Sequence, residues 1–238
     1  MNFLQLCQRV QLLTRGSEGL VGTTPTTTVS QEGNLLEIVE WVNIAYADIQ
    51  AKHRQWRFLT ATGTVNTSSS TRTYTITSTI STYAKLIPYM AQEGDRPFIL
   101  CHLNSIGVSD QSLVYYTPWA EFVGGVLDRG SRPSSRPSRF TIQPSGVFEL
   151  DPTPDNTYVL TFDYRRSIDV LSGNTDEPLM SSEYHMAIVW RAVHYYCITR
   201  DGTSDFYQKV QREYDREMRR LENAELPDAE LFEAIEHP

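Results

Sequence analysis

The hydrophobic residues of this chain repeat with a helical period at both ends and with a strand period in between. Residues 2–14 and 34–53 each place their apolar side chains on one helical face, and Asn34 with Glu37 fits a capping box. Residues 181–200 are apolar on most of the circumference, and residues 204–221 carry one apolar stripe on a charged helix. None of these helices can bury its stripe alone, so we expect them to pack together. The ends of the chain are therefore predicted to form a helical bundle.

From residue 57 the period changes to two. The stretch "TRTYTITSTIST", residues 71–82, is typical of one or two exposed strands because β-branched threonine favours pleated surfaces. Further strands are predicted at 98–103, 113–116, 140–142, 147–150 and 158–164, whereas residues 118–127 are compatible with a single helical turn. Short strands separated by Gly, Pro, Asn and Asp favour an antiparallel sheet or sandwich.

These periods divide the chain into four parts. Residues 1–56 and 178–225 are predicted to be the two halves of the helical bundle, residues 57–177 an inserted β-rich module, and residues 226–238 a C-terminal docking tail. The predicted fold class is α+β.

Four aspartates, Asp151, Asp155, Asp163 and Asp169, raise the question of catalysis or cation binding. Asp and Pro in "DPTPDN" are also strong turn formers. We expect this turn to join strands 147–150 and 158–164 as a hairpin, so that the acidic residues shape the chain rather than act in chemistry.

Other candidate chemistry is sparse. His185, His194 and Cys197 share one helix, but zinc requires four donors and no second pair completes a site. The sequence has no nucleophile elbow, no phosphate-binding loop and no dinucleotide motif. The three cysteines are far apart and odd in number, which is typical of reduced, buried thiols in a cytosolic setting. We expect no catalysis, no metal and no cofactor.

The segment "DRGSRPSSRPSRF" spaces Arg129, Arg132, Arg136 and Arg139 along a Ser/Pro-rich stretch. Two interpretations remain open: a solvated loop, or a mobile basic arm that contacts phosphates or an acidic partner. Arginines so widely spaced cannot read bases, so any contact with DNA would be non-specific.

The last residues, "LENAELPDAELFEAIEHP", carry a short apolar face. Burying Leu231, Phe232 and Ile235 yields at most roughly 5–9 kcal/mol, while ordering about a dozen residues costs ~1–2 kcal/mol each. The tail therefore cannot fold alone. It either folds back on its own bundle or docks as an amphipathic helix in a partner's groove, with Leu226 at its start.

Overall charge and hydropathy argue against two classes. The formal net charge of −8 argues against nucleic-acid binding by the whole surface and leaves a local basic patch open. No apolar run reaches the roughly 20 residues of a membrane span. The N-terminus has neither a basic start nor a long apolar region, so no signal peptide is expected.

Several stretches resemble the head-to-tail connector, or portal adaptor, proteins of tailed bacteriophages. They are "FLQLCQRV", "LLEIVEWVNIAYADIQAKHRQWRFL", "FELDPTPDNTYVLTFDYRR", "DVLSGNTDEPLM" and "EYHMAIVWRAVHYY". The resemblance implies a ring of twelve identical subunits beneath the portal, extending the DNA channel and docking tail or nozzle proteins. Such a protein is made in the host cytoplasm and resides in the neck of the virion.

The resemblance also implies that the tail grips the portal protein ring and that helix 181–200 packs in the bundle or between subunits, through Tyr184, Ile188, Trp190 and Tyr195. Non-specific contact with channel DNA would be compatible with this role, and no membrane partner is expected. An alternative is a virion-associated glycan-binding β-sandwich, in which Tyr115, Tyr116 and Trp119 stack on sugar rings.

Overall fold

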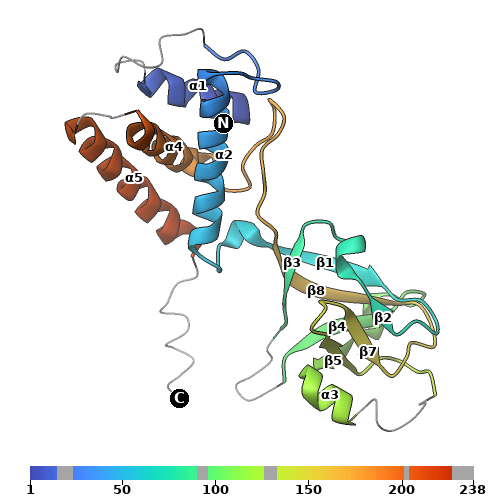
Figure 1. The fold of residues 1–238 in the computed structure, drawn as a ribbon. Helices are drawn as coiled ribbons and strands as arrows, with labels where there is room; N and C mark the ends of the chain where they lie inside the picture. The colour runs from blue at the N-terminus through green and yellow to red at the C-terminus, as the bar shows by residue number, and fades with distance from the viewer. Residues whose placement is uncertain (15–23, 90–95, 126–132, 201–203, 227–238) are drawn as a thin grey trace, which may run out of the picture. The chain divides into compact units, whose positions relative to one another are not determined.

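The computed structural model describes residues 1–14, 24–89, 96–125, 133–200 and 204–226. The chain divides into two compact units (Figure 1). Unit 1, called here the helical unit, comprises Met1–Leu59 together with the chain from Ile168 onward, and unit 2, the β unit, comprises Thr60–Ser167. Mixed α+β architecture, with helices at both ends of the chain and strands between them, is as predicted.

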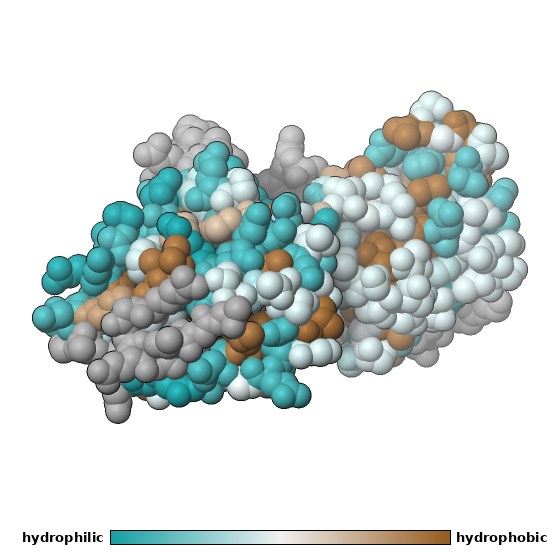
Figure 2. Space-filling model, turned by 90° about the horizontal axis from the view of Figure 1, so that it is seen from above, coloured by the Kyte–Doolittle hydropathy of each residue, from teal (hydrophilic) through white to brown (hydrophobic). Residues whose placement is uncertain are grey.

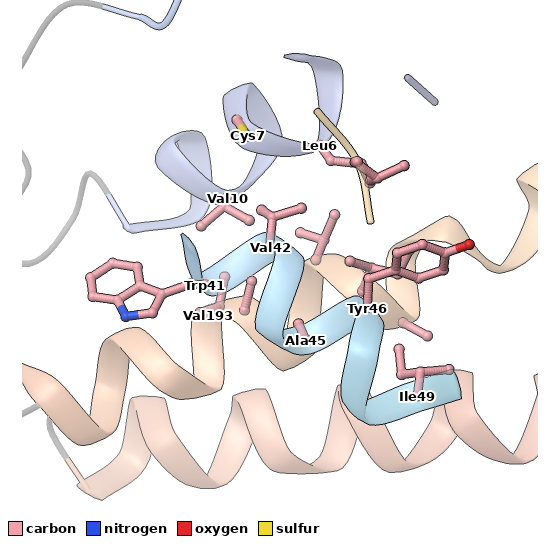
Figure 3. Packing of buried hydrophobic residues seen from close by; sticks show 14 of the residues in the cluster. Leu6, Cys7, Val10, Trp41, Val42, Ala45, Tyr46, Ile49 and Val193 are labelled. Atoms are coloured by element: carbon pink, nitrogen blue, oxygen red, sulfur yellow. The ribbon is translucent and has the colours of Figure 1, made fainter. Parts of the chain in front are cut away.

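Four helices build the helical unit. They are α1 (Phe3–Thr14), α2 (Asn34–Lys52), α4 (His185–Thr199) and α5 (Ser204–Glu225). Helix α4 contacts each of the other three, which explains why its sequence is apolar on most sides. Figure 3 shows the centre of this packing, where labelled side chains converge from α1 (Leu6, Cys7, Val10), α2 (Trp41, Val42, Ala45, Tyr46, Ile49) and α4 (Val193).

The predicted capping box at α2 is wrong. Gly33, at φ +57°, occupies the N-cap position, and no side-chain cap hydrogen bond forms there. Asn34 and Glu37 instead accept hydrogen bonds from the Arg200 guanidinium. A reciprocal capping box does exist at α1. The backbone N–H of Gln5 donates to Asn2 Oδ1 at 2.9 Å, and the backbone N–H of Asn2 donates to Gln5 Oε1 at 3.0 Å.

The segment that follows the β unit is held against α2 by hydrogen bonds to two side-chain amides. Asn43 bonds both the backbone N–H and the carbonyl of Leu171, at 3.2 and 3.0 Å. Gln50 does the same for Asp169, at 2.9 and 3.0 Å. Residues 168–177 thus belong to the helical unit, whereas the sequence pattern predicts them in the inserted module.

The β unit is one eight-stranded, curled sheet. Its strands are β1 (Thr60–Asn66), β2 (Thr73–Tyr74), β3 (Tyr83–Ile87), β4 (Phe98–Leu103), β5 (Ser112–Tyr116), β6 (Arg139–Ile142), β7 (Phe148–Asp151) and β8 (Tyr158–Arg166). The order is β1-β8-β4-β5-β6-β7-β2, with β3 also paired to β8. All pairings are antiparallel except β5 with β6. A short helix, α3 (Trp119–Gly125), follows β5.

Strand β8 organises this sheet. Tyr158, Leu160, Phe162 and Tyr164 are buried, whereas the residues between them are only partly covered, as the alternation in the sequence predicts. The buried face of the sheet packs into its own hydrophobic cluster, which includes Val65, Ile99, Val114 and Phe148. No residue of this cluster belongs to the helical unit.

Two strand predictions are corrected. The Thr-rich stretch 71–82 forms only the two-residue strand β2 and a 3₁₀ turn, Ile76–Ser78. The predicted hairpin across "DPTPDN" does not form, because β7 pairs with β6 and β2, while β8 pairs with β1, β3 and β4. Both edges of β8 are thus occupied, and no edge remains for β7.

Candidate functional site

Asp155, Asp163 and Asp169 accept hydrogen bonds from hydroxyl groups. Asp155 accepts from the Tyr158 hydroxyl at 2.7 Å, and Asp163 accepts from Thr62 and Tyr89 at 2.6 and 3.1 Å. Asp151 is buried at the end of β7, and Asp169 lies in the helical unit, where the Tyr46 hydroxyl donates to it at 3.2 Å. Within the described residues, no group of three or more His, Cys, Asp or Glu side chains could hold a metal ion.

The histidines and cysteines of α4 are packing residues. Burial lowers the pKa of His185 and of His194, which favours neutral imidazoles. The thiols of Cys7, Cys101 and Cys197 are buried and not disulfide-bonded. Burial raises the pKa of Cys7 to about 12 and that of Cys101 to about 11, which suppresses the reactive thiolate.

The arginine segment is only partly described. Arg129 and Arg132 lie outside the described residues. Arg136 forms an ion pair with Asp110, and its guanidinium lies 5.3 Å from the centre of the Tyr158 ring. Arg139 begins β6, paired with Asp151 of β7. The second half of the segment is therefore bonded to the β unit.

The four residues predicted to pack, three of them on α4 and Tyr184 just before it, lie in or against the helical core. Ile188 is fully buried, while Tyr184, Trp190 and Tyr195 are partly buried against it. Tyr195 also joins a polar cluster in which the Arg191 guanidinium donates to Asp48 of α2 at 2.8 Å. Arg191 lies 5.5 Å from the Tyr214 ring of α5, so this cluster links three helices.

The three aromatic residues of the alternative, glycan-binding interpretation do not share one surface role. Tyr116 packs against the sheet core beside Phe140, and Trp119 stacks on buried Phe122 with 6.3 Å between ring centres. Tyr115 is exposed and contacts Phe98 on the outward face of β4 and β5.

Of the tail residues, only Leu226 is described. It is partly buried against the helical core, and its amide donates to the Glu222 carbonyl at 3.0 Å, continuing α5. Leu231, Phe232 and Ile235 lie outside the described residues.

The charges of α5 (Ser204–Glu225) are segregated around the helix, a feature that its apolar stripe alone does not predict. Its most exposed arc carries five basic side chains: Lys209, Arg212, Arg216, Arg219 and Arg220. At 100° per residue these positions span about 100° of the helix circumference. A helical-wheel projection of residues 204–225 would have revealed this segregation.

The two units differ in the hydropathy of their surfaces. Figure 2 shows mostly hydrophilic residues on the helical unit and mostly residues of intermediate hydropathy on the β unit, each with hydrophobic patches. In the part of the chain that the structure describes, no helix combines the length and the apolar character that crossing a membrane requires.

The chain was compared with curated proteins and with protein-family models. No curated protein matches the chain. The sequence model for the SU10 adaptor protein matches residues 1–230 and so covers both units. The chain therefore belongs to the SU10 adaptor protein family, a family of phage head-tail adaptors.

Proposed function

We propose that this protein is a structural adaptor in the neck of a tailed phage virion. Identical subunits, twelve in number, form a ring beneath the portal; the ring extends the DNA channel and gives tail components a docking surface. The observation that carries this proposal is the family match, which extends through the helical unit and the β unit alike.

The surface of the helical unit suits lateral association. Exposed apolar side chains occur on three of its helices: Leu12 on α1, Leu36 and Ile44 on α2, and Ile198 on α4. Ring formation would remove such side chains from water, which stabilises the assembly by about 25 cal/mol for each Å² of apolar area buried. The apolar circumference of α4 is already covered by α1, α2 and α5. Contacts between subunits would thus use these outer residues rather than the centre of α4.

The grip on the portal is assigned to the C-terminal segment. Leu226 lies at the end of α5 against the helical core, so the apolar residues that follow it, Leu231, Phe232 and Ile235, are tethered to a folded body. An amphipathic segment held in this way can bind a groove on a partner. The subunit alone is expected to be monomeric or weakly associated, because its docking segment then has no partner.

Sedimentation with the portal ring tests this function. Full-length protein should join the portal in a large complex, whereas a variant with Leu231→Asp, Phe232→Asp and Ile235→Asp should not. A matched control, Glu230→Gln with Glu233→Gln, changes the same segment but keeps its apolar face and should still join.

Each other outcome is informative. If the triple Asp variant joins the portal as the control does, the adaptor role stands but the tail is not the part that binds the portal. If none of the three proteins joins the portal, including the unaltered one, the adaptor role is contradicted. A stable ring of the purified protein at micromolar concentration would contradict the expectation of weak self-association.

A further inference from the structure

The outward arc of α5 is a basic surface, called here the basic arc: Lys209, Arg212, Arg216, Arg219 and Arg220. All five side chains are exposed, and the other residues of the arc between positions 208 and 223 are Gln208 and Asn223. From Lys209 to Arg219 the arc extends about 15 Å along the helix, at 1.5 Å per residue. It therefore contains neither an acidic nor an apolar side chain over three helical turns.

Between positions 208 and 223 the acidic residues of α5 lie outside this arc, whereas Asp205, one turn before Lys209, projects on the same side of the helix. Glu217 is only 4% exposed and pairs with Arg216 and Arg220, at 3.3 and 2.9 Å. Glu222 binds Lys52 and His53 of α2, each at 2.8 Å. A helix that needed only solvation would not require this segregation in a chain of net charge −8.

Three members of the basic arc have no acidic partner among the residues that the structure describes. Arg216 pairs with Glu213 at 2.5 Å as well as with Glu217. By contrast, no ion pair to a described residue forms at Lys209, Arg212 or Arg219. Their charges remain available to an external anion.

We propose that the basic arc binds the phosphate backbone of double-stranded DNA without reading its sequence. Successive basic residues three or four positions apart lie about 5–6 Å from one another along one helix face. This row can contact consecutive phosphates of one strand, which are the source of affinity in sequence-independent DNA binding.

The composition of the arc favours DNA over an acidic protein surface. Protein interfaces of useful affinity have an apolar or aromatic centre that excludes water, and the basic arc has none. Phosphate contacts need no such centre. The proposal relies on the proposed function only for the presence of DNA in the channel.

Binding of the purified full-length protein to a fluorescently labelled 30-base-pair duplex tests the proposal, by anisotropy at several KCl concentrations. The test variant carries Lys209→Gln, Arg212→Gln and Arg219→Gln. The matched control carries Arg9→Gln, Arg54→Gln and Lys85→Gln, which removes the same charge from exposed positions elsewhere. Circular dichroism checks that both variants are folded.

We expect the unaltered protein to bind at about 50 mM salt, with a log–log salt slope of about −2.7 to −4.5 for roughly three to five phosphate contacts. The arc variant should bind at least ~10-fold more weakly, with a slope shallower by about 2–3, and the control should bind nearly as the unaltered protein does. Absence of binding by the unaltered protein would overturn the proposal, as would an equal loss in the control.

The portal experiment separates this proposal from the proposed function. An arc variant that joins the portal but binds DNA weakly supports both. An arc variant that binds DNA normally yet no longer joins the portal shows that the basic arc contacts a protein, and overturns the DNA assignment.

Discussion

Single residues of the helical unit hold segments that are distant in sequence. The Tyr46 hydroxyl of α2, fully buried, accepts from the Leu179 amide at 2.8 Å and donates to Asp169. It therefore anchors both ends of the irregular chain between the β unit and α4. From the sequence, Tyr46 is recognisable as an apolar face residue, but its hydroxyl contacts are not, because both partners lie more than 100 positions away.

We predict that Tyr46→Phe lowers the free energy of unfolding by about 1–3 kcal/mol, because a buried amide and a carboxylate lose their partner. Tyr184→Phe is the matched control, since no described residue bonds the Tyr184 hydroxyl. Its cost should be small. Urea unfolding followed by circular dichroism measures both, and equal costs would contradict the anchoring role.

His194 makes stability depend on pH. Burial, and then the charge of Arg191, lower its pKa below the usual 6.5; Asp215 acts in the opposite direction, and Tyr207 contacts the ring. Below pH 6.5 the unfolded chain takes up a proton that the folded state resists, so folding loses stability as pH falls. We predict a lower urea midpoint at pH 5.5 than at pH 7.5.

In His194→Gln this difference between pH 5.5 and pH 7.5 should shrink, since one of the contributing groups is absent. His185, whose pKa is also lowered by burial, retains its own contribution. An unchanged pH difference in the variant would show that His194 does not contribute.

At the scale of elements, helix ends were harder to predict than helix faces. Asn34 and Glu37 have the spacing of a capping box, but Gly33 occupies the N-cap position. The Arg200 guanidinium donates hydrogen bonds to the side chains of both Asn34 and Glu37. Asn2 and Gln5 have the same spacing and do form the box. Local spacing alone cannot distinguish the two, because the competing arginine comes from α4's far end.

We predict that Asn2→Ala costs about 1 kcal/mol of stability, since the backbone N–H of Gln5 in the first turn of α1 loses its acceptor. Gln5→Ala should cost less, because it removes the weaker half of the box. The double variant should cost less than the sum, since each bond presupposes the other residue's position. Strict additivity in urea unfolding would contradict a reciprocal box.

The presence of strands could be predicted from the alternation of apolar and polar residues, but the pairing of the strands could not. Alternate burial of Tyr158, Leu160 and Phe162 was visible in the sequence, whereas the neighbours of β8 come from residues 60–66, 83–87 and 98–103. A turn sequence such as "DPTPDN" indicates a change of direction without specifying the partner strand. By contrast, the basic arc of α5 could be predicted from the spacing of basic residues along one helix.

For the whole molecule, the sequence predicted an insertion at residues 57–177, whereas the β unit comprises Thr60–Ser167, so the predicted end lies further from the observed one than the predicted start does. The period change marks its start near residue 57, and the structure places it at Thr60. At the other end, the residues that Asn43 and Gln50 fasten have no period of their own. Their assignment to the helical unit depends on contacts across more than 100 residues, which periodicity cannot show.

We predict that residues 60–167 fold when expressed alone. Their hydrophobic cluster contains no residue of the helical unit, and their ends meet where Thr60 pairs with Arg165. A dispersed amide spectrum and a cooperative thermal transition would be expected. Residues 1–59 alone should remain unfolded, because α4 supplies the centre of their core. A molten β unit, or a folded 1–59 fragment, would contradict this division.

The pairing of β1 with β8 also determines how the β unit responds to mechanical load. The chain enters the unit at Thr60 and leaves it just after Arg165 and Arg166, so both attachment points lie at the same end of one antiparallel pair. Tension pulling these points apart would break the hydrogen bonds between the two strands one after another, as in a zipper, rather than all together in shear. The β unit is thus attached in the direction in which the hydrogen bonds between β1 and β8 carry the load one at a time.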